Sequence, residues 1–142
     1  MSISFTTRTP RPNEVDGIDY HFISHEEFQK KIETKDLLEY VELHGEYYGT
    51  SKAQVEKLQN DGKHVVLVID TQGGLNLKNQ IEVVLIFIMP PTFEELSLRL
   101  NKRKTEKLEE IEKRLSWAKH EMEDAKHYDY IIVNDNLNTA YQ

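Results

Sequence analysis

HVVLVID, residues 64–70, decides the fold class together with two later stretches of the same kind. These are EVVLIFIMPP, residues 82–91, and YDYIIVND, residues 128–135. All three are rich in β-branched residues, and their apolar residues are continuous rather than alternating with polar ones. Such runs are typical of strands that are buried on both faces of a parallel sheet. The sequence therefore predicts an α/β fold.

Helical patterns separate these apolar runs. Thr92 is followed three residues later by Glu95, which is a capping-box signature for the start of a helix. A second helix is marked by an apolar stripe from Leu108 to Ala125, with Glu and Lys on the opposite face. Strands that alternate with helices predict a three-layer arrangement, in which a parallel sheet is flanked by helices through right-handed crossovers.

The first sixty residues follow a different pattern. ISFTT, DYHFI and LLEYVEL read as short strands, and Asp16 with Gly17 as a turn. Ser24 with Glu27 predicts the start of one short helix, and Ser51 with Gln54 the start of another. We therefore expect one domain, 1–142, with a small mixed α+β subdomain at about 4–50 and a core at about 63–142.

Composition excludes several classes of function. The formal net charge is −7, which argues against a general binder of nucleic acid or of membrane surfaces. No apolar run approaches the roughly 20 residues that span a bilayer. The chain has no cysteine, so disulfides and thiolate metal sites are excluded, and a cytoplasmic location is the expectation.

TTRTPRP, residues 6–12, presents two arginines in a segment that cannot be helical. Pro10 and Pro12 favour an extended backbone, so Arg8 and Arg11 project to the same side, roughly 9 Å apart at about 3.1 Å per residue. Two such forks suit a phosphate or a carboxylate. The alternative is a solvated loop whose arginines pair with nearby acids.

Asp70 stands at the carboxyl end of the first apolar run, where ligands bind in open α/β sheets. In phosphate-transfer proteins an aspartate in this position serves Mg²⁺ or the substrate. The alternative is that Asp70 caps the following helix.

Two further groups of residues have alternatives of this kind. In GEYYGTS, residues 45–51, glycines bracket two tyrosines, which suits either close approach to a phosphate ligand or a hairpin turn with packed aromatics. Arg99 and Arg103 share a helix face and Arg114 lies in the next helix, so they either converge on a polyphosphate or pair with acids four residues away.

Taken in order, these segments resemble the guanylate kinases. The order is SxSxTTRxPRxxExxGxDYxF, LLE, YYGT, VxxxIDxQG, FIxPP, an arginine-rich segment from Arg99 to Leu115, and VND. The match extends from Ser2 to about Tyr141. It implies a P-loop kinase type of fold and the transfer of a phosphoryl group from ATP to GMP, with Mg²⁺ accompanying ATP as the cofactor.

The resemblance assigns expected roles to residues. GMP and ATP are the implied partners. The acceptor residues for GMP would be Ser4, Arg8, Arg11, Tyr20, Glu39, Tyr48, Gly49, Thr50 and Asp70. Among them, Arg8 and Arg11 would hold the phosphate, and Glu39 would read guanine because a carboxylate accepts from its ring N–H and its 2-amino group. The catalytic arginines would be Arg99, Arg103 and Arg114, in and beside a lid around 99–107, with Asn134 on the ATP side. No side chain is expected to hold the metal directly; Asp70 is a candidate through water.

This sequence also departs from the family pattern. The 142 residues contain no GxxxxGK(S/T) motif, the P-loop that holds the β- and γ-phosphates of ATP. We therefore expect a chain that lacks the first βα unit, carries the GMP-acceptor half and is inactive alone. Val68 replaces an acid that is frequent in the family, and Lys104 replaces a lid glycine. The alternative function is a non-catalytic guanylate-kinase-like module that binds GMP or a phosphorylated peptide.

Overall fold

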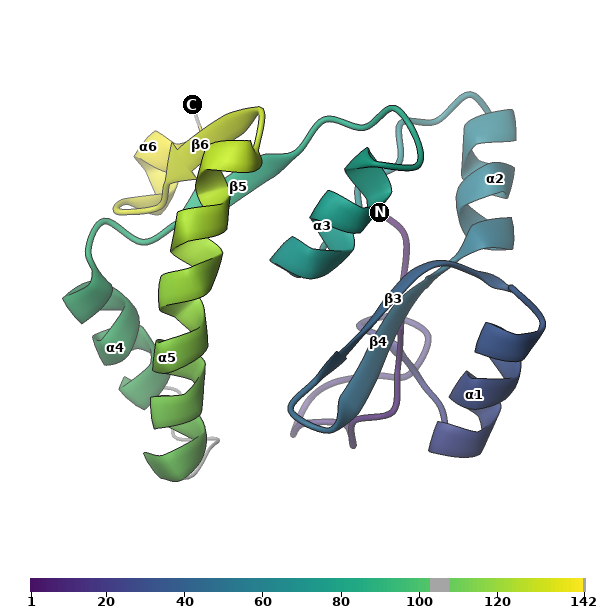
Figure 1. Cartoon of the computed structure of the whole chain (residues 1–142), viewed down its shortest axis with the longest axis horizontal. Helices are drawn as coiled ribbons and strands as arrows, with labels where there is room; N and C mark the ends of the chain where they lie inside the picture. Colours follow the sequence, from purple (N-terminus) through teal and green to yellow (C-terminus); the bar gives the residue numbers. More distant parts are fainter. Residues whose placement is uncertain (103–107, 142) are drawn as a thin grey trace. The chain divides into compact units, whose positions relative to one another are not determined.

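The computed structural model describes residues 1–102 and 108–141, and for residues 108–110 it describes the backbone alone. Two compact units make up the chain, Met1–Ile81 and Glu82–Gln142. Figure 1 labels their α-helices and their longer strands, and each unit is described by itself. The predicted functional division, at about 4–50 and 63–142, stays a prediction.

The first unit is built on a mixed four-stranded sheet in the order β2-β1-β4-β3. β1 runs parallel to β2 and antiparallel to β4, and β3 runs antiparallel to β4. The strands are β1 (Phe5–Thr6), β2 (His21–Phe22), β3 (Leu37–Leu43) and β4 (Glu46–Ser51). The predicted strands within ISFTT, DYHFI and LLEYVEL are therefore confirmed, although the first two are short.

A tight hairpin joins β3 and β4, and it sets which face of β3 is buried (Figure 1). His44 and Gly45 form its two-residue turn with φ of 55° and 82°. Positive φ at both central residues is the requirement of a type I′ turn, whose twist matches that of the flanking strands. In the resulting register Glu39 lies opposite Thr50, and Glu39 and Val41 are buried.

Two helices pack beside this sheet, and both begin at the predicted caps. α1 (His25–Glu33) has a complete capping box between Ser24 and Glu27. α2 (Lys52–Asn60) begins after Ser51, whose hydroxyl accepts from the backbone N–H of Gln54. Phe28 of α1 is fully buried and stacks on Tyr47 of β4 at 5.3 Å between ring centroids. This aromatic contact joins the helix to the sheet.

The predicted strand at 64–70 is wrong. This stretch is described but forms no strand. Among the described residues, a single backbone hydrogen bond joins it to a segment distant in sequence, from the N–H of Ser2 to the carbonyl of Val66 at 3.1 Å. A strand requires a ladder of such bonds with a neighbour. Val68, expected to be buried, is 69% exposed. The stretch leads into α3 (Thr71–Lys78), for which Asp70 is the N-cap.

The second unit contains a two-stranded parallel sheet of β5 (Ile86–Met89) and β6 (Tyr130–Val133), in which Ile86 pairs with Tyr130. Its helices are α4 (Phe93–Lys102), α5 (Leu108–Asp124), a 3₁₀ turn (Ala125–His127) and α6 (Leu137–Tyr141). α4 begins after Thr92, whose hydroxyl accepts from Glu95 N at 3.1 Å. The helical stripe is confirmed, because Ile111, Ala118 and Ala125 are buried.

The expected three-layer parallel sheet is corrected to these two sheets, one mixed and one of two parallel strands. Burial of the parallel strands on both faces is also corrected, because Ile88 in β5 is 64% exposed. Each strand of a two-stranded sheet has one hydrogen-bonded neighbour, so a continuous apolar run does not by itself produce burial. The α/β class holds.

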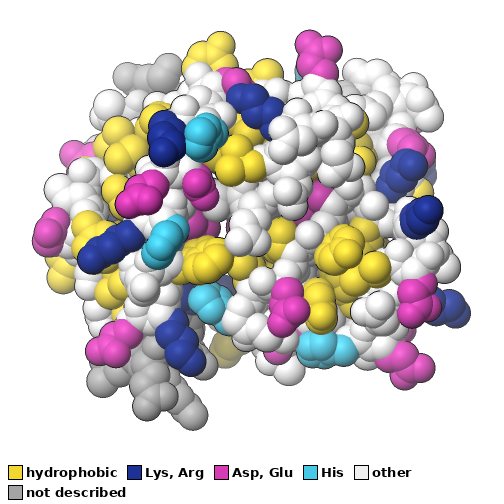
Figure 2. Space-filling model, in the orientation of Figure 1, with side chains coloured by type: hydrophobic (Ala, Val, Ile, Leu, Met, Phe, Trp, Pro, Cys, Tyr) yellow, Lys and Arg dark blue, Asp and Glu magenta, His cyan; other side chains and the backbone are white. Residues whose placement is uncertain are grey.

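The surface seen in Figure 2 carries acidic and basic side chains interspersed with apolar ones. Among the described residues, no helix combines the length and the apolar character that a membrane crossing requires.

Candidate functional site

A pocket of about 230 Å³ lies within the first unit. Its walls come from the residues directly before β1 and β2, from the β3–β4 hairpin, and from the end of the stretch that precedes α3. The lining residues are Ser4, Tyr20, Glu39, Val41, Leu43, Tyr48, Gly49, Val68, Ile69 and Asp70. The structure therefore gathers six of the predicted acceptor residues around one cavity.

Glu39 is the buried acid of this pocket. Its position on the inward face of β3 leaves it 6% exposed. Thr50, its partner across the hairpin, donates a hydrogen bond from Oγ1 to Glu39 Oε1 at 2.6 Å. Burial raises the pKa of Glu39, and the nearby Asp70 raises it further, while the Thr50 hydrogen bond opposes the rise. A desolvated carboxylate of this kind favours a ligand that brings N–H donors.

Asp70 is the second acid of the pocket, and only one of its oxygens is occupied. Oδ1 accepts from Gly73 N at 2.9 Å, which confirms the helix-capping alternative. Oδ2 is buried and has no hydrogen-bond partner among the described residues. Burial raises the pKa of Asp70, and backbone hydrogen bonds oppose this. The free oxygen leaves room for a ligand donor in addition to the cap.

The same oxygen, Asp70 Oδ2, is also a candidate to bind Mg²⁺ through water. Among the described side chains, no group of three or more His, Cys, Asp or Glu residues could hold a metal ion. Mg²⁺ is typically held by one or two carboxylates together with substrate phosphates and water. The described side chains fit an ion that is held mainly by ATP phosphates and water, which Asp70 Oδ2 would reach through a water molecule.

Gly49 is required by packing inside the fold. A side chain at residue 49 would place its Cβ 2.9 Å from Cζ of Phe28 and 3.1 Å from the backbone oxygen of Glu39. Gly49 therefore approaches α1 and β3 closely, and the close approach to a ligand expected of it stays a prediction. Ser4, which also lines the pocket, is fixed by its carbonyl, which accepts from His21 N at 2.9 Å.

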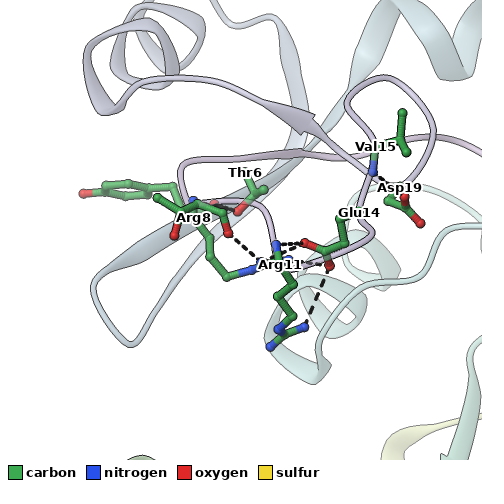
Figure 3. Close-up of polar contacts among 8 residues, drawn as sticks. Thr6, Arg8, Arg11, Glu14, Val15 and Asp19 are labelled. Carbon is green, nitrogen blue, oxygen red and sulfur yellow. Dashed lines mark hydrogen bonds and ion pairs between the residues drawn. The ribbon is translucent and has the colours of Figure 1, made fainter. Parts of the chain in front are cut away.

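Arg8 and Arg11 meet at one carboxylate, that of Glu14 (Figure 3). Arg8 donates through both terminal nitrogens, each 3.0 Å from an oxygen of Glu14. The backbone N–H of Arg11 donates to Glu14 Oε2 at 2.6 Å, and its side chain lies 4.0 Å from Oε1. Pairing with a nearby acid, the alternative, is thus confirmed, and the joint binding of a phosphate by the two arginines stays a prediction.

Tyr20 connects this arginine pair to the pocket. The Arg8 guanidinium lies 5.6 Å from the centroid of the Tyr20 ring, and Tyr20 meets the Tyr48 ring edge-on at 6.2 Å. Burial raises the pKa of Tyr20, so its hydroxyl keeps its proton and remains a donor. Arg8, Tyr20 and Tyr48 therefore form a group with one positive charge and two hydroxyls. The two acids of the pocket, by contrast, present carboxyl groups.

The sequence alone assigns no role to Glu14, although this residue is the glutamate of the SxSxTTRxPRxxExxGxDYxF pattern. Its spacing of three residues after Arg11 was the available signal, but spacing alone does not show that one carboxylate serves both arginines. The hydrogen bond from Arg8 holds the pKa of Glu14 below its usual value. Glu14 is therefore a structural counter-ion for the pair.

Glu14→Gln is expected to lower the free energy of unfolding by about 1 kcal/mol at pH 7. Because the folded-state pKa of Glu14 is lowered, its contribution is present above the usual value of 4.5 and is lost as the pH falls through the folded-state value. Denaturant unfolding at pH 7 and pH 3 measures the difference. Glu56→Gln, at an exposed position of α2, is the control. A difference of equal size at both pH values would contradict the ion-pair explanation.

The second unit brings together two of the remaining predicted residues. Arg99 pairs with Glu95 at 2.7 Å, and it also donates to the backbone carbonyl of Asn134 at 2.8 Å. Arg99 thus ties α4 to the segment after β6. Arg114 lies half-buried on α5. Arg103 and Lys104 lie outside the described residues.

A family model described as guanylate kinase matches residues 1–142. The chain belongs to the guanylate kinase family. It is 55% identical over 141 residues to a guanylate kinase of Protochlamydia amoebophila, covering 99% of this chain and 72% of that protein. It is 48% identical over 141 residues to a guanylate kinase of Chlamydia trachomatis serovar D, covering 99% of this chain and 69% of that protein.

A solved guanylate kinase structure shares the fold. The crystal structure of guanylate kinase from Anaplasma phagocytophilum matches with a TM-score of 0.83 at 36% identity, covering 99% of this chain and 69% of that chain. The family resemblance inferred from the sequence is confirmed. Guanylate kinases are phosphotransferases, so the chain that carries this pocket and this arginine pair belongs to a family of enzymes that transfer phosphoryl groups.

Proposed function

We propose that the first unit of this chain binds GMP as the acceptor in the reaction of ATP with GMP to give ADP and GDP. The observation that carries the proposal is the polarity of the pocket. A buried carboxylate, Glu39, lines it together with Asp70, and Tyr20 leads from it to Arg8. GMP has the matching polarity, with N–H donors on guanine and a dianionic phosphate at the other end.

Guanine is the ligand that fits the acidic side of the pocket. Its ring N–H and 2-amino group lie on one edge, so a carboxylate can accept from both. The Thr50 hydroxyl holds Glu39 Oε1, which fixes the carboxylate before a ligand arrives. At the position of the guanine ring N–H, adenine has a ring nitrogen that carries no proton. This nitrogen would face the carboxylate as a second acceptor, with no hydrogen bond between them. Ser4 and Asp70 are the further polar groups proposed to face the base.

The phosphate is assigned to Arg8 and Arg11 with the hydroxyls of Tyr20 and Tyr48. Charge-assisted hydrogen bonds from a guanidinium are about twice as strong as neutral ones, and its fork matches a phosphate. Glu14 keeps the Arg8 fork oriented and neutralised while no phosphate is bound. In this assignment the tyrosines donate without adding charge.

The transfer itself requires ATP, and the residues proposed for it are Arg99, Arg103, Arg114 and Asn134. An oxygen of the GMP phosphate attacks the γ-phosphorus of ATP in line, and the bond to the bridging oxygen breaks, leaving ADP. When bound with ATP, Mg²⁺ would neutralise the charge of the phosphates. Arginines that reach the transferring group would stabilise the charge on its oxygens. The lid role of 99–107 and the cytoplasmic location remain part of this proposal.

The 142 residues hold no GxxxxGK(S/T) sequence, so the groups that cradle the β- and γ-phosphates are not among them. We propose that this part of the protein supplies the GMP-acceptor half. Phosphoryl transfer then depends on a P-loop in the working enzyme.

Arg8→Lys tests the phosphate end of the proposed site. Lysine is a point charge and loses the two-point contact, so GMP is expected to bind about tenfold more weakly. Guanosine lacks the phosphate and serves as the control ligand, whose affinity is expected to stay within about twofold. Calorimetric titration of the parent chain and of Arg8→Lys with both ligands gives the four affinities. Equal losses for GMP and guanosine would overturn the assignment of the phosphate to Arg8.

A further inference from the structure

The first turn of α3 passes directly beside the carboxylate of Glu39. Gly73, in that turn, is buried, and its N–H donates to Asp70 Oδ1 at 2.9 Å. A side chain at residue 73 would place its Cβ 2.7 Å from Glu39 Oε2 and 3.1 Å from Asp70 Oδ1. These separations are inside the ~3.5–4.0 Å at which non-bonded atoms pack best. Residue 73 therefore faces both pocket acids with no room for a methyl group.

The two acids are not equally able to move away from such a methyl group. Asp70 is tied to the helix, because its Oδ1 caps α3 through the same Gly73. Glu39 is held at Oε1 by Thr50, but an added methyl group would meet its other oxygen, Oε2. The least costly response is a rotation of the Glu39 carboxylate, because this disturbs one side chain and leaves the backbone in place.

We propose that Gly73 is a positioning residue for Glu39, which sets the preference for GMP over its analogue without the 2-amino group, IMP. This rests on the proposed function, in which Glu39 reads guanine. The absence of a side chain at residue 73 lets Glu39 Oε2 lie beside the first turn of α3, with Oε1 on Thr50. A rotated carboxylate no longer presents two oxygens to the two donors of guanine, so the contribution of the 2-amino group is lost first.

Helix energetics support a role for this glycine other than helix formation. Glycine is among the weakest helix formers, and alanine is the strongest. Gly73 belongs to α3 and its φ does not lie in the left-handed region, so the backbone does not require glycine. The neighbouring carboxylate supplies the physical reason for glycine at this position.

The test compares Gly73→Ala with Gln72→Ala, a control at an exposed position in the same helical turn. Calorimetric titration measures the affinities of each variant and of the parent chain for GMP and IMP. We expect Gly73→Ala to reduce the ratio of GMP to IMP affinity about fivefold or more, with little change for IMP. Gln72→Ala is expected to leave the ratio unchanged.

The outcomes separate this inference from the function on which it rests. If the parent chain prefers GMP and Gly73→Ala keeps that preference, Gly73 does not position Glu39 for it. If the parent chain itself does not prefer GMP over IMP, the proposed reading of guanine is overturned, and the selectivity role of Gly73 with it.

A second variant covers the case in which Gly73→Ala does not fold. In Gly73→Ala/Glu39→Ala the nearer carboxylate, that of Glu39, is removed, and only the 3.1 Å approach of the methyl group to Asp70 Oδ1 remains. We expect this double variant to fold with a higher midpoint of thermal unfolding than Glu39→Ala alone, because alanine favours the helix. A lower midpoint would show that the clash lies elsewhere and would overturn the proposal.

Discussion

A chain in which a β-strand and a P-loop precede Ser2 is expected to convert ATP and GMP to ADP and GDP, whereas the 142 residues alone are expected to leave both nucleotides unchanged. The physical reason is the charge of the ATP phosphates. A P-loop supplies backbone N–H groups and a lysine that hold the β- and γ-phosphates for in-line attack. The sequence of 142 residues contains no such motif.

The measurement is the rate of ADP and GDP formation from the fused and unfused chains at saturating nucleotide. For the fusion we expect turnover on the order of 1–100 per second, the usual range of kinases. The matched control is the same fusion with its P-loop lysine changed to alanine. A folded fusion that stays at background would contradict this view and would point to the proposed lid, in which we expect Lys104 to replace a glycine.

Glu39→Gln is expected to weaken GMP binding by about 100-fold and IMP binding by only about tenfold. Each hydrogen bond to a charged group contributes about 1.5–3 kcal/mol, and GMP makes two to this carboxylate where IMP makes one. The amide of glutamine presents one acceptor and one donor, so one N–H of guanine would face another donor. Affinities for both nucleotides, measured by calorimetry, give the comparison.

The same substitution is expected not to destabilise the chain. Burial raises the pKa of Glu39 above its usual 4.5, so the folded chain loses stability as the pH rises from that value through the folded-state pKa. A neutral glutamine does not ionise, so the variant lacks this loss of stability. The midpoint of thermal unfolding of the variant at pH 7 is therefore expected to equal or exceed that of the parent chain. Equal losses of GMP and IMP affinity in a stable variant would exclude Glu39 as the residue that reads guanine.

The sequence predicts local structure well where local chemistry determines it. LLEYVEL forms β3 with the expected bounds, and the caps at Ser24, Ser51 and Thr92 begin helices. HVVLVID fails as a strand because strand formation depends on a hydrogen-bonded neighbour. A run of valines and leucines has the composition of a strand. That composition does not determine which other segment would form hydrogen bonds with it.

The candidate site divides in the same way. The residues proposed to bind GMP were found by the order of motifs, which also identified the family. Two features came only from the three-dimensional arrangement. One carboxylate, Glu14, serves both Arg8 and Arg11, and Gly73 leaves room for Glu39. Both depend on contacts between side chains, and residue spacing does not specify how those side chains are oriented.

Calorimetric titration of this chain with GMP, IMP and AMP tests the central proposal most directly. GMP and IMP share the phosphate and the ring N–H, and IMP lacks the 2-amino group that Glu39 is proposed to bind. We expect micromolar binding of GMP, weaker binding of IMP by about tenfold, and the weakest binding of AMP. A folded chain that binds all three nucleotides equally, or binds none of them, would contradict the proposal that this pocket is a GMP-acceptor site.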